Sequence, residues 1–286
     1  MEIARAWGAE ICSVDSMLVY RGMDVGTAKP STAQRAQVAH HLLDVAEPSE
    51  RFTVARFQAL ATDALAQIRA RGARPLLAGG SGLYLRAVVD DLIFPGEDAQ
   101  IRLTLEREAA SAGAGRLYAR LRDLDPVAAA KIEPENVRRI VRALEVPAVT
   151  GALFSGFASA WDRFEPGRMR AAGIEIDKPA LAARIDERVS AMFAAGWLAE
   201  VRSLVEAGFG GWLTSTQAIG YSELARHLDG RLTLEEAWER TARRTRALAR
   251  RQMAWFRRDP RIRWFDAGSG GAMDVLDDVR TYLEGA

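Results

Sequence analysis

The chain has 286 residues, of which 49% are hydrophobic and 27% charged, and its net charge is +1. This composition is typical of globular proteins with one large or two smaller domains, and it argues against a disordered chain. No run of apolar residues is long enough to predict a membrane span, and the opening MEIARAWGAE lacks the apolar core of a signal peptide. The single cysteine, Cys12, excludes an internal disulfide and a Cys-based zinc site, so we expect a cytoplasmic protein without a membrane partner.

Hydrophobic periodicity predicts helices that alternate with short buried strands in the first third of the chain. The predicted elements are a helix end at 1–7, a strand at 9–14, a helix at 53–71 capped by Thr53, a strand at 74–79 and a helix from about residue 83. A strand followed by a glycine turn and a helix is the repeating unit of parallel α/β sheets.

The pattern changes after Pro95-Gly96, because residues 97–149 predict helices without a strand. The later predicted elements are a returning strand at 169–176, helices at 179–195, 198–207, 217–228 and 234–257, and a short strand at 263–265. We therefore expect an α/β core made of residues 1–95 and 169–286, with an all-helical insertion at 96–168.

Arginines are clustered although the net charge is close to zero. Residues 241–258 contain seven arginines and no acid, and residues 136–142 contain three more. A charge run is usually a solvated helix face, but seven like charges without a compensating acid favour contact with a polyanion.

Two loops are expected at the carboxyl ends of strands, where parallel sheets bind their ligands. Asp15 and Ser16 end the first strand, and Gly79, Gly80 and Ser81 end the second. Taken alone, Asp15 is better explained as a helix cap; the alternative is a carboxylate that accepts a proton or orients an N–H donor. The glycine turn and its hydroxyl suit an anion, although such turns occur wherever a strand meets a helix tightly.

Two further pairs of side chains carry phosphate-binding chemistry. Thr27 and Lys29 lie in a glycine-containing loop and could contact phosphate. Arg184 and Arg188 lie one helical turn apart, which is usually a solvated surface and alternatively a clamp for a diphosphate.

Several segments, taken in chain order, are similar to those of one enzyme family. They read DSM-VYRGMD-GTAKP from Asp15, HHLLDV from His40, LLAGGSGLYLRA from Leu76, DPVAAAKI and RIVRALEV in the helical region, RID-RV from Arg184, QAIGY from Gln217, and RRTR-LA-RQ--WFRRD from Arg243. With them the chain resembles the tRNA dimethylallyltransferases from Gly8 to about Asp266. The VYRGMD-GTAKP and RQ--WFRRD segments are the most specific of these.

The resemblance implies an α/β fold with a P-loop NTPase-like parallel sheet, and a helical insertion that grips the anticodon stem-loop of tRNA. It also implies transfer of the dimethylallyl group from dimethylallyl diphosphate to N6 of the adenosine 3′ to the anticodon, with Mg²⁺ assisting the departure of diphosphate. The expected partners are tRNA and dimethylallyl diphosphate, and the protein is expected to be a monomer. No metal ligand from the protein is predicted, because the adjacent side chains of His40 and His41 diverge and lack a completing cluster.

The resemblance also implies roles for individual residues. Asp15 is expected to orient or deprotonate the attacking amine, Arg188 to hold the diphosphate, and Ser81, where the family usually has threonine, to contribute its hydroxyl to catalysis and to the diphosphate site. The residues expected to contact tRNA are Asp15, Ser16, Met17, Leu18, Ser81, Arg102, Arg138, Arg139, Ile140, Val141, Arg142, Gln217, Ala218, Ile219, Gly220, Tyr221 and Ser222.

The sequence departs from the family pattern at its beginning. The family starts with a strand and a GPTASGK(S/T) loop that cradles the diphosphate, whereas MEIARAWGAE matches the second half of the following helix. We expect the missing strand to be central, so that the edges of neighbouring strands are exposed. Either Met1 is an internal methionine and the true protein is longer, which the intact remaining motifs favour, or the product is truncated and weak or inactive.

Two other functions are compatible with these motifs. A prenyl transferase that acts on a free adenine nucleotide is one, although a free nucleotide needs no helical insertion to grip an anticodon. A non-catalytic tRNA-binding protein is the other, and it would bind tRNA without forming a product.

Overall fold

A computed structural model describes residues 1–158 and 163–285. The chain divides into two compact units, each described here by itself: unit 1 comprises residues 1–89 and 166–286, and unit 2 comprises residues 90–165. The Pro95-Gly96 pair, used as a boundary in the sequence analysis, lies inside unit 2. The reason is that Arg142 donates hydrogen bonds to the carbonyl oxygens of Pro95 (2.7 Å) and Gly96 (3.0 Å) and ties them to a helix of that unit.

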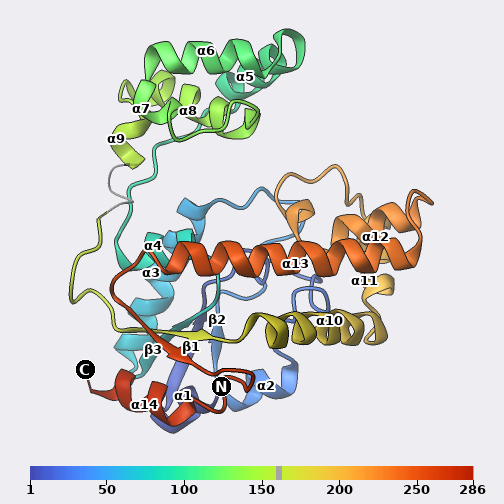
Figure 1. Cartoon of the computed structure of the whole chain (residues 1–286). Coiled ribbons are helices and arrows are strands. Elements are labelled where there is room, and N and C mark those ends of the chain that lie inside the picture. The colour runs from blue at the N-terminus through green and yellow to red at the C-terminus, as the bar shows by residue number, and fades with distance from the viewer. Residues whose placement is uncertain (159–162, 286) are drawn as a thin grey trace. The chain divides into compact units, whose positions relative to one another are not determined.

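The strands of unit 1 form two parallel sheets (Figure 1). The first has the order β2-β1-β3 and the second pairs β4 with β5. Their bounds are β1 Ala9–Ser13, β2 His40–His41, β3 Arg74–Ala78, β4 Ala171–Glu175 and β5 Ile262–Asp266. The four strands predicted from the sequence are confirmed, and so is their parallel direction. The two-residue strand β2 was not predicted.

The two sheets share no backbone pairing within the part of the chain that the structure describes. Among the described residues, β3 pairs only with β1 and β4 pairs only with β5. The described strands of unit 1 thus form two separate sheets.

The helices of unit 1 cover both sheets (Figure 1). Their bounds are α1 Glu2–Trp7, α2 Thr32–Gln37, α3 Val54–Ala70, α4 Gly82–Val89, α10 Lys178–Ala194, α11 Trp197–Glu206, α12 Tyr221–Leu228, α13 Leu234–Phe256 and α14 Leu276–Glu284, with a 3₁₀ turn at Ser215–Gln217. The predicted cap of α3 is confirmed, because the hydroxyl of Thr53 accepts a hydrogen bond from the backbone N–H of Arg56 at 3.2 Å. The helix predicted to start at Gln217 starts at Tyr221 instead, because Gly220 has a positive φ of 89°.

The main core of unit 1 lies between the first sheet and helices from both halves of the chain. Its fully buried side chains include Phe57 and Ile68 of α3, Trp197 of α11 and Tyr221 of α12. The core therefore joins the loops after β1 to α11 and α12, which lie far away in the sequence.

Unit 2 is a small bundle of helices. Its helices are α5 Ala99–Ala112, α6 Ala114–Leu124, α7 Pro126–Ala129, α8 Val137–Thr150 and α9 Phe154–Ala158. Leu105, Leu117, Leu121, Ile140 and Leu144 are buried together as its core. Within the described residues the unit has no strand.

None of the helices in the described part of the chain is both long and apolar enough to cross a membrane.

Candidate functional site

The two predicted ligand loops lie side by side at the carboxyl edge of the first sheet. Strands β1 and β3 pair up to Ser13 and Ala78, and the ladder continues beyond them because Ser81 donates its backbone N–H to the carbonyl oxygen of Val14 at 3.1 Å. The Ser81 hydroxyl then accepts the backbone N–H of Ser16 at 3.1 Å. The neighbourhood of Ser81 and the Asp15-Ser16 loop expected from the sequence is thus present.

Asp15 uses one of its two carboxylate oxygens to shape the turn that follows it. Its Oδ1 accepts the backbone N–H groups of Met17 (2.7 Å) and Leu18 (3.3 Å). The explanation of Asp15 as a helix cap is wrong, because no helix follows it directly and the chain turns back here to form a loop. Oδ2 of Asp15 has no hydrogen-bond partner among the described residues and is free to accept a proton or to orient an amine.

Helix α13 covers the glycine turn after β3. The side-chain amide of Gln252 donates to the carbonyl oxygen of Gly80 at 3.0 Å, and a Cβ atom on Gly80 would lie 2.2 Å from that amide nitrogen. A Cβ atom on Gly82 would lie 2.2 Å from the ring of Trp255. The glycines are needed because α13 approaches closely, so on this side the turn is filled by protein rather than open to an anion.

Tyr84 of α4 belongs to the surroundings of Asp15, although the sequence analysis did not single it out. Burial, together with the nearby Tyr20 hydroxyl and the Asp15 carboxylate, raises the pKa of the Tyr84 hydroxyl well above its usual value. Its ring lies 4.4 Å from that of Phe57, centroid to centroid. Tyr84 therefore remains a neutral phenol near Asp15 at physiological pH.

Lys29 is a structural residue, which contradicts the expectation that it contacts phosphate. Its side chain is 1% exposed, and its Nζ donates to the carbonyl oxygen of Tyr20 and to the carboxylates of Asp24 and Asp44, each at 2.6 Å. All three ammonium protons are thus used within the protein. The Thr27 hydroxyl likewise donates to the carbonyl oxygen of Met23 at 2.6 Å, so it folds back on its own loop.

A carboxylate that the sequence analysis missed holds the same loop from the other side. Glu200 of α11 accepts the backbone N–H groups of Asp24 (2.8 Å), Val25 (2.8 Å) and Gly26 (3.3 Å). It also accepts the hydroxyl of Tyr221 at 2.6 Å. A glutamate in the first turn of an amphipathic helix gives no sequence signal for such a role, because acids are common there.

The 217–222 segment, which is expected to contact tRNA, contains both exposed and buried residues. Gln217 is exposed, whereas Tyr221 and Ala218 are buried (0% and 3% exposed). Ile219 and Ser222 are partly buried, and Gly220 is buried. The Tyr221 and Ala218 side chains thus belong to the core, which leaves Gln217, Ile219 and Ser222 as candidates for RNA contact.

Arg188 lies on the exposed side of α10, where its guanidinium has no hydrogen bond or ion pair with any described residue. Its predicted clamp partner Arg184 donates to the carbonyl oxygen of Ser269 at 3.5 Å and packs against Gly271. Asp186 joins α10 to α13 through an ion pair with Arg246. Arg188 thus stays available for an anion, while Arg184 is engaged elsewhere.

Two of the predicted tRNA-contacting arginines of unit 2 share one buried carboxylate. Glu145 is 0% exposed and accepts Arg102 at 2.5 Å, Arg142 at 2.8 Å and the backbone N–H of Asp98 at 3.0 Å. Burial raises the pKa of Glu145, but these hydrogen bonds outweigh it and hold the pKa below its usual value. Arg102 and Arg142 therefore stabilise the unit, whatever further contacts they make.

The predicted 138–142 segment divides into an exposed and a buried part. Arg138 and Arg139 are exposed on α8. Ile140 and Val141 are 0% and 2% exposed because they form the core of unit 2. The interpretation of Ile140 and Val141 as RNA-contacting side chains is therefore wrong, and the two arginines before them carry the basic surface.

The arginine-rich segment of α13 is partly neutralised by acids from other elements. Arg244 pairs with Glu223, Arg246 with Asp186 and Arg257 with Glu175. The absence of acids within 241–258 was therefore misleading, because the compensating carboxylates come from α12, α10 and β4. Arg243, Arg250 and Arg251 are exposed and form no ion pair with a described residue.

The site fits Mg²⁺ through its hard oxygen donors rather than through a cluster of acids. Within the described residues, no three His, Cys, Asp or Glu side chains come together as a metal site. The Asp15 carboxylate and the Ser16 and Ser81 hydroxyls lie together, the hydroxyl oxygens 3.5 Å apart. Because Mg²⁺ prefers oxygen ligands and completes its shell with phosphate oxygens and water, these donors are of the kind that Mg²⁺ binds.

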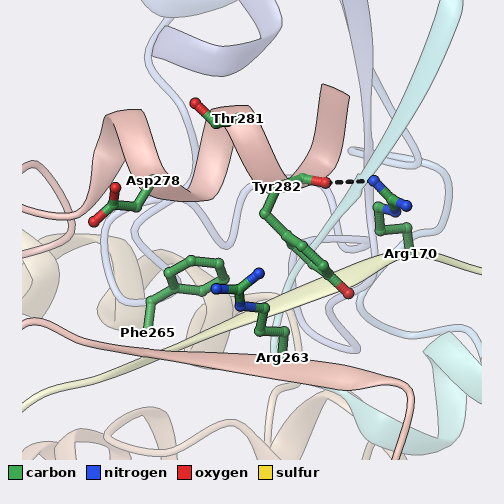
Figure 2. A pocket seen from close by; sticks show the side chains of 6 residues that line it. All are labelled: Arg170, Arg263, Phe265, Asp278, Thr281 and Tyr282. Carbon is green, nitrogen blue, oxygen red and sulfur yellow. Dashed lines mark hydrogen bonds between the residues drawn. The ribbon is translucent and has the colours of Figure 1, made fainter. Parts of the chain in front are cut away.

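A separate hollow of about 650 Å³ lies on the second sheet beside α14. Figure 2 shows the guanidinium of Arg263 between the rings of Phe265 and Tyr282, 5.1 Å from each centroid. Arg170 donates to the carbonyl oxygen of Tyr282 at 2.7 Å. None of the predicted site residues lines this hollow, so it is not assigned to the candidate site.

Comparison with known proteins was made against family models, curated proteins and solved structures. The family model described as IPP transferase matches residues 18–259. A tRNA dimethylallyltransferase of Kineococcus radiotolerans is 50% identical over 275 residues, which cover 96% of this chain and 86% of the relative. The crystal structure of the tRNA isopentenylpyrophosphate transferase of Bacillus halodurans is 38% identical, with a TM-score of 0.71 over 99% of this chain and 90% of that one. A eukaryotic dimethylallyltransferase acting on tRNA shares the fold, with a TM-score of 0.76 at 24% identity over 98% of this chain and 72% of that one.

Proposed function

The chain belongs to the IPP transferase family, and we propose that it is a tRNA dimethylallyltransferase. In the proposed reaction, the dimethylallyl group passes from dimethylallyl diphosphate to N6 of the adenosine that follows the anticodon. The reaction takes place in the cytoplasm, where tRNA is modified, and the protein acts as a monomer.

The observation that carries the proposal is the geometry of Asp15. Its Oδ1 is fixed by two backbone N–H groups of the following turn, while Oδ2 has no partner among the described residues. The turn itself is held by the Ser16–Ser81 hydrogen bond at the carboxyl edge of the sheet. A carboxylate fixed at one oxygen and free at the other is preorganised to act on an amine.

The chemistry needs such a carboxylate because the exocyclic amine of adenine is a weak nucleophile. As the bond from N6 to C1 of the dimethylallyl group forms, the bond from C1 to the diphosphate oxygen breaks and the diphosphate leaves with the electron pair. The amine loses one proton, which Asp15 accepts. The allylic carbon tolerates positive charge, so the remaining demand is for cations at the departing diphosphate.

Arg188 is the cation proposed to meet that demand, and the Ser81 hydroxyl is proposed to donate a hydrogen bond to the diphosphate. Arg188 has no competing ion pair among the described residues, which supports a role in holding the diphosphate. Mg²⁺, held by the Ser16 and Ser81 hydroxyls with diphosphate oxygens and water, would supply additional neutralisation of the diphosphate charge and leave Oδ2 of Asp15 for the amine. Lys29 takes no part, since its three donors are used within the protein.

The proposed RNA contacts come from exposed arginines and from the Asp15–Leu18 turn. In unit 2 these are Arg138 and Arg139, together with the partly buried Arg102 and Arg142, and in unit 1 they include the exposed arginines of α13. Gln217 and Ser222 add hydrogen-bonding groups. The target adenine must leave the base stack of the RNA to reach Asp15. Unstacking costs about a few kcal/mol, and contacts between the adenine and the protein offset this cost.

The experiment that tests the proposal offers the chain two acceptors. Purified protein is incubated with dimethylallyl diphosphate, Mg²⁺ and either an anticodon stem-loop RNA or AMP, and the nucleosides are identified by mass spectrometry. We expect N6-isopentenyladenosine from the stem-loop and none from AMP. Product from AMP alone would identify a prenyl transferase of free nucleotides, and RNA binding without product would identify a non-catalytic RNA-binding protein.

A further inference from the structure

Helix α11 joins two segments that are far apart in the sequence: the loop at 24–26, which follows the Asp15 turn along the chain, and the segment at 217–222, which the proposed function uses for RNA contact. Glu200 of this helix receives hydrogen bonds from both. Its Oε2 accepts the backbone N–H groups of Asp24 and Val25, each at 2.8 Å, and its Oε1 accepts Gly26 at 3.3 Å and the Tyr221 hydroxyl at 2.6 Å. A single carboxylate therefore links the two segments.

Trp197, one turn before Glu200, makes a second link between the same segments by packing. A Cβ atom on Gly26 would lie 2.0 Å from its Nε1, and one on Gly220 would lie 1.9 Å from its Cη2. The indole is therefore held between two glycines that are distant in the sequence. Its Nε1–H is buried without an acceptor among the described residues, so packing rather than a hydrogen bond fixes the ring.

The loop held by Glu200 is connected to the Asp15 turn by the short stretch of chain between residues 18 and 26. Tyr20 donates its hydroxyl to Thr214 Oγ1 at 2.6 Å, so this stretch is also joined to the region just before Ser215–Gln217. Glu200 is partly buried, and hydrogen bonds to a carboxylate are stronger than those between neutral groups, so four of them to one side chain hold the groups that they join. The Asp15 turn and the 217–222 segment thus share one rigid support.

We infer that Glu200 is a positioning residue for RNA: it sets the 217–222 segment relative to the Asp15 turn, and Trp197 maintains the same spacing. This inference rests on the proposed function, because it takes both segments as parts of one RNA-binding surface. Glu200 itself touches neither the RNA nor the diphosphate. Its loss is expected to affect the RNA substrate and to leave use of dimethylallyl diphosphate nearly unchanged.

The test compares Glu200→Gln with Glu206→Gln, an exposed glutamate at the end of the same helix. Glutamine has nearly the size of glutamate, but one of its two terminal groups is an NH₂ group, which cannot accept a hydrogen bond. This group would face either the backbone N–H groups of residues 24–26 or the Tyr221 hydroxyl, all of which donate to Glu200. We expect the KM for an anticodon stem-loop RNA to rise about tenfold, as for the loss of one or two hydrogen bonds to a charged group. The KM for dimethylallyl diphosphate should stay within about twofold, and Glu206→Gln should match the wild type.

Tyr221→Phe adds a second, milder variant, because it removes only the link from Oε1 to α12. We expect a smaller rise in the RNA KM, about threefold, and little further rise when it is combined with Glu200→Gln. Full additivity of the two variants, an unchanged RNA KM in Glu200→Gln, or an equal rise of both KM values would overturn the inference.

Amide hydrogen exchange and RNA binding provide readouts that do not depend on catalysis. In Glu200→Gln, exchange at Asp24, Val25 and Gly26 and at residues 220–221 should accelerate together, and the Kd for the stem-loop should rise in parallel. Acceleration confined to 24–26, or an unchanged Kd, would contradict the inference even if no transfer activity is found. Absence of product from the wild-type protein would instead count against the proposed function.

Discussion

Gln252 donates its side-chain amide to the carbonyl oxygen of Gly80 at 3.0 Å, and this hydrogen bond joins the longest helix of the chain to the turn that supports the candidate site. Trp255, one turn further along α13, packs on Gly82 of the same turn. The two sequence segments LLAGGSGLYL and RQMAWFRRD are therefore two sides of one contact. A larger side chain in one segment would therefore disturb the packing of the other.

This contact predicts that two similar glycine substitutions have different costs. A Cβ atom on Gly80 meets the end of the flexible Gln252 side chain, which can move away with the loss of one hydrogen bond, about 1 kcal/mol. A Cβ atom on Gly82 meets the rigid Trp255 ring, and relief requires a shift of α13 at about 1–3 kcal/mol or more. Urea unfolding should place Gly82→Ala below Gly80→Ala in stability. Gly115→Ala in α6, where a Cβ atom meets nothing within 4 Å, is the control.

Asp15 gives a prediction that separates its chemical role from its structural one. Asp15→Asn keeps an oxygen for the backbone N–H groups of Met17 and Leu18 but removes the negative charge, whereas Asp15→Ala loses both. We expect both variants to lose turnover by at least about 100-fold, with RNA affinity little changed. Only Asp15→Ala should lose stability, by about 1 kcal/mol. An asparagine variant with near-normal turnover would remove Asp15 from the proposed chemistry.

The parts of the site that could be predicted from sequence depend on local patterns. The strands before Asp15 and Gly79 were visible as apolar runs, and parallel pairing then brings their ends together, so the proximity of Asp15 and Ser81 was predictable. The partners of Lys29 and the contacts of Glu200 were not, because they depend on which distant segments the core places side by side. The same holds for the arginines of α13, whose acidic partners lie on three other elements.

Lys29 and Arg188 form a contrasting pair of cations, one buried in ion pairs and one exposed without them. Lys29→Met leaves the Asp44 carboxylate with one cation fewer, and we expect a loss of about 3 kcal/mol in the free energy of unfolding. The KM for dimethylallyl diphosphate should be unchanged in the folded fraction. Arg188→Gln should instead raise the KM for dimethylallyl diphosphate and leave the free energy of unfolding unchanged. Lys178→Met, at an exposed lysine of α10, controls for the loss of a positive charge.

Glu145 predicts an acid-sensitive step in the stability of unit 2. Burial raises its pKa, but hydrogen bonds from Arg102, Arg142 and the Asp98 N–H lower it by more, so the folded state binds a proton less readily than the unfolded state. Its stabilising contribution is therefore fully present above the ordinary carboxyl pKa, about 4.3, and is lost as the pH falls through the lowered value. Thermal unfolding between about pH 3 and pH 7 should show a steeper acid decline for the wild type than for Glu145→Gln.

The size of the effect distinguishes Glu145 from surface acids. Glu145→Ala leaves two guanidinium groups without their shared partner and should cost about 3–5 kcal/mol. Glu106→Gln, at an exposed position of α5, should change stability by less than about 0.5 kcal/mol. Equal acid sensitivity in the wild type and in Glu145→Gln would mean that another carboxylate dominates the acid unfolding of this unit.

The exposed Arg138 and Arg139 lead to a prediction about RNA binding that depends on salt. Arginine–phosphate contacts release counterions, so each lost contact should reduce the slope of log Kd against log salt concentration by about 0.7–0.9. We expect the double variant Arg138→Gln, Arg139→Gln to reduce the slope by about 1–2 and to weaken binding most at low salt. Arg122→Gln, at an exposed arginine of α6, should leave the slope unchanged. A double variant with the wild-type slope would place the phosphate contacts of unit 2 on a different face, away from the start of α8.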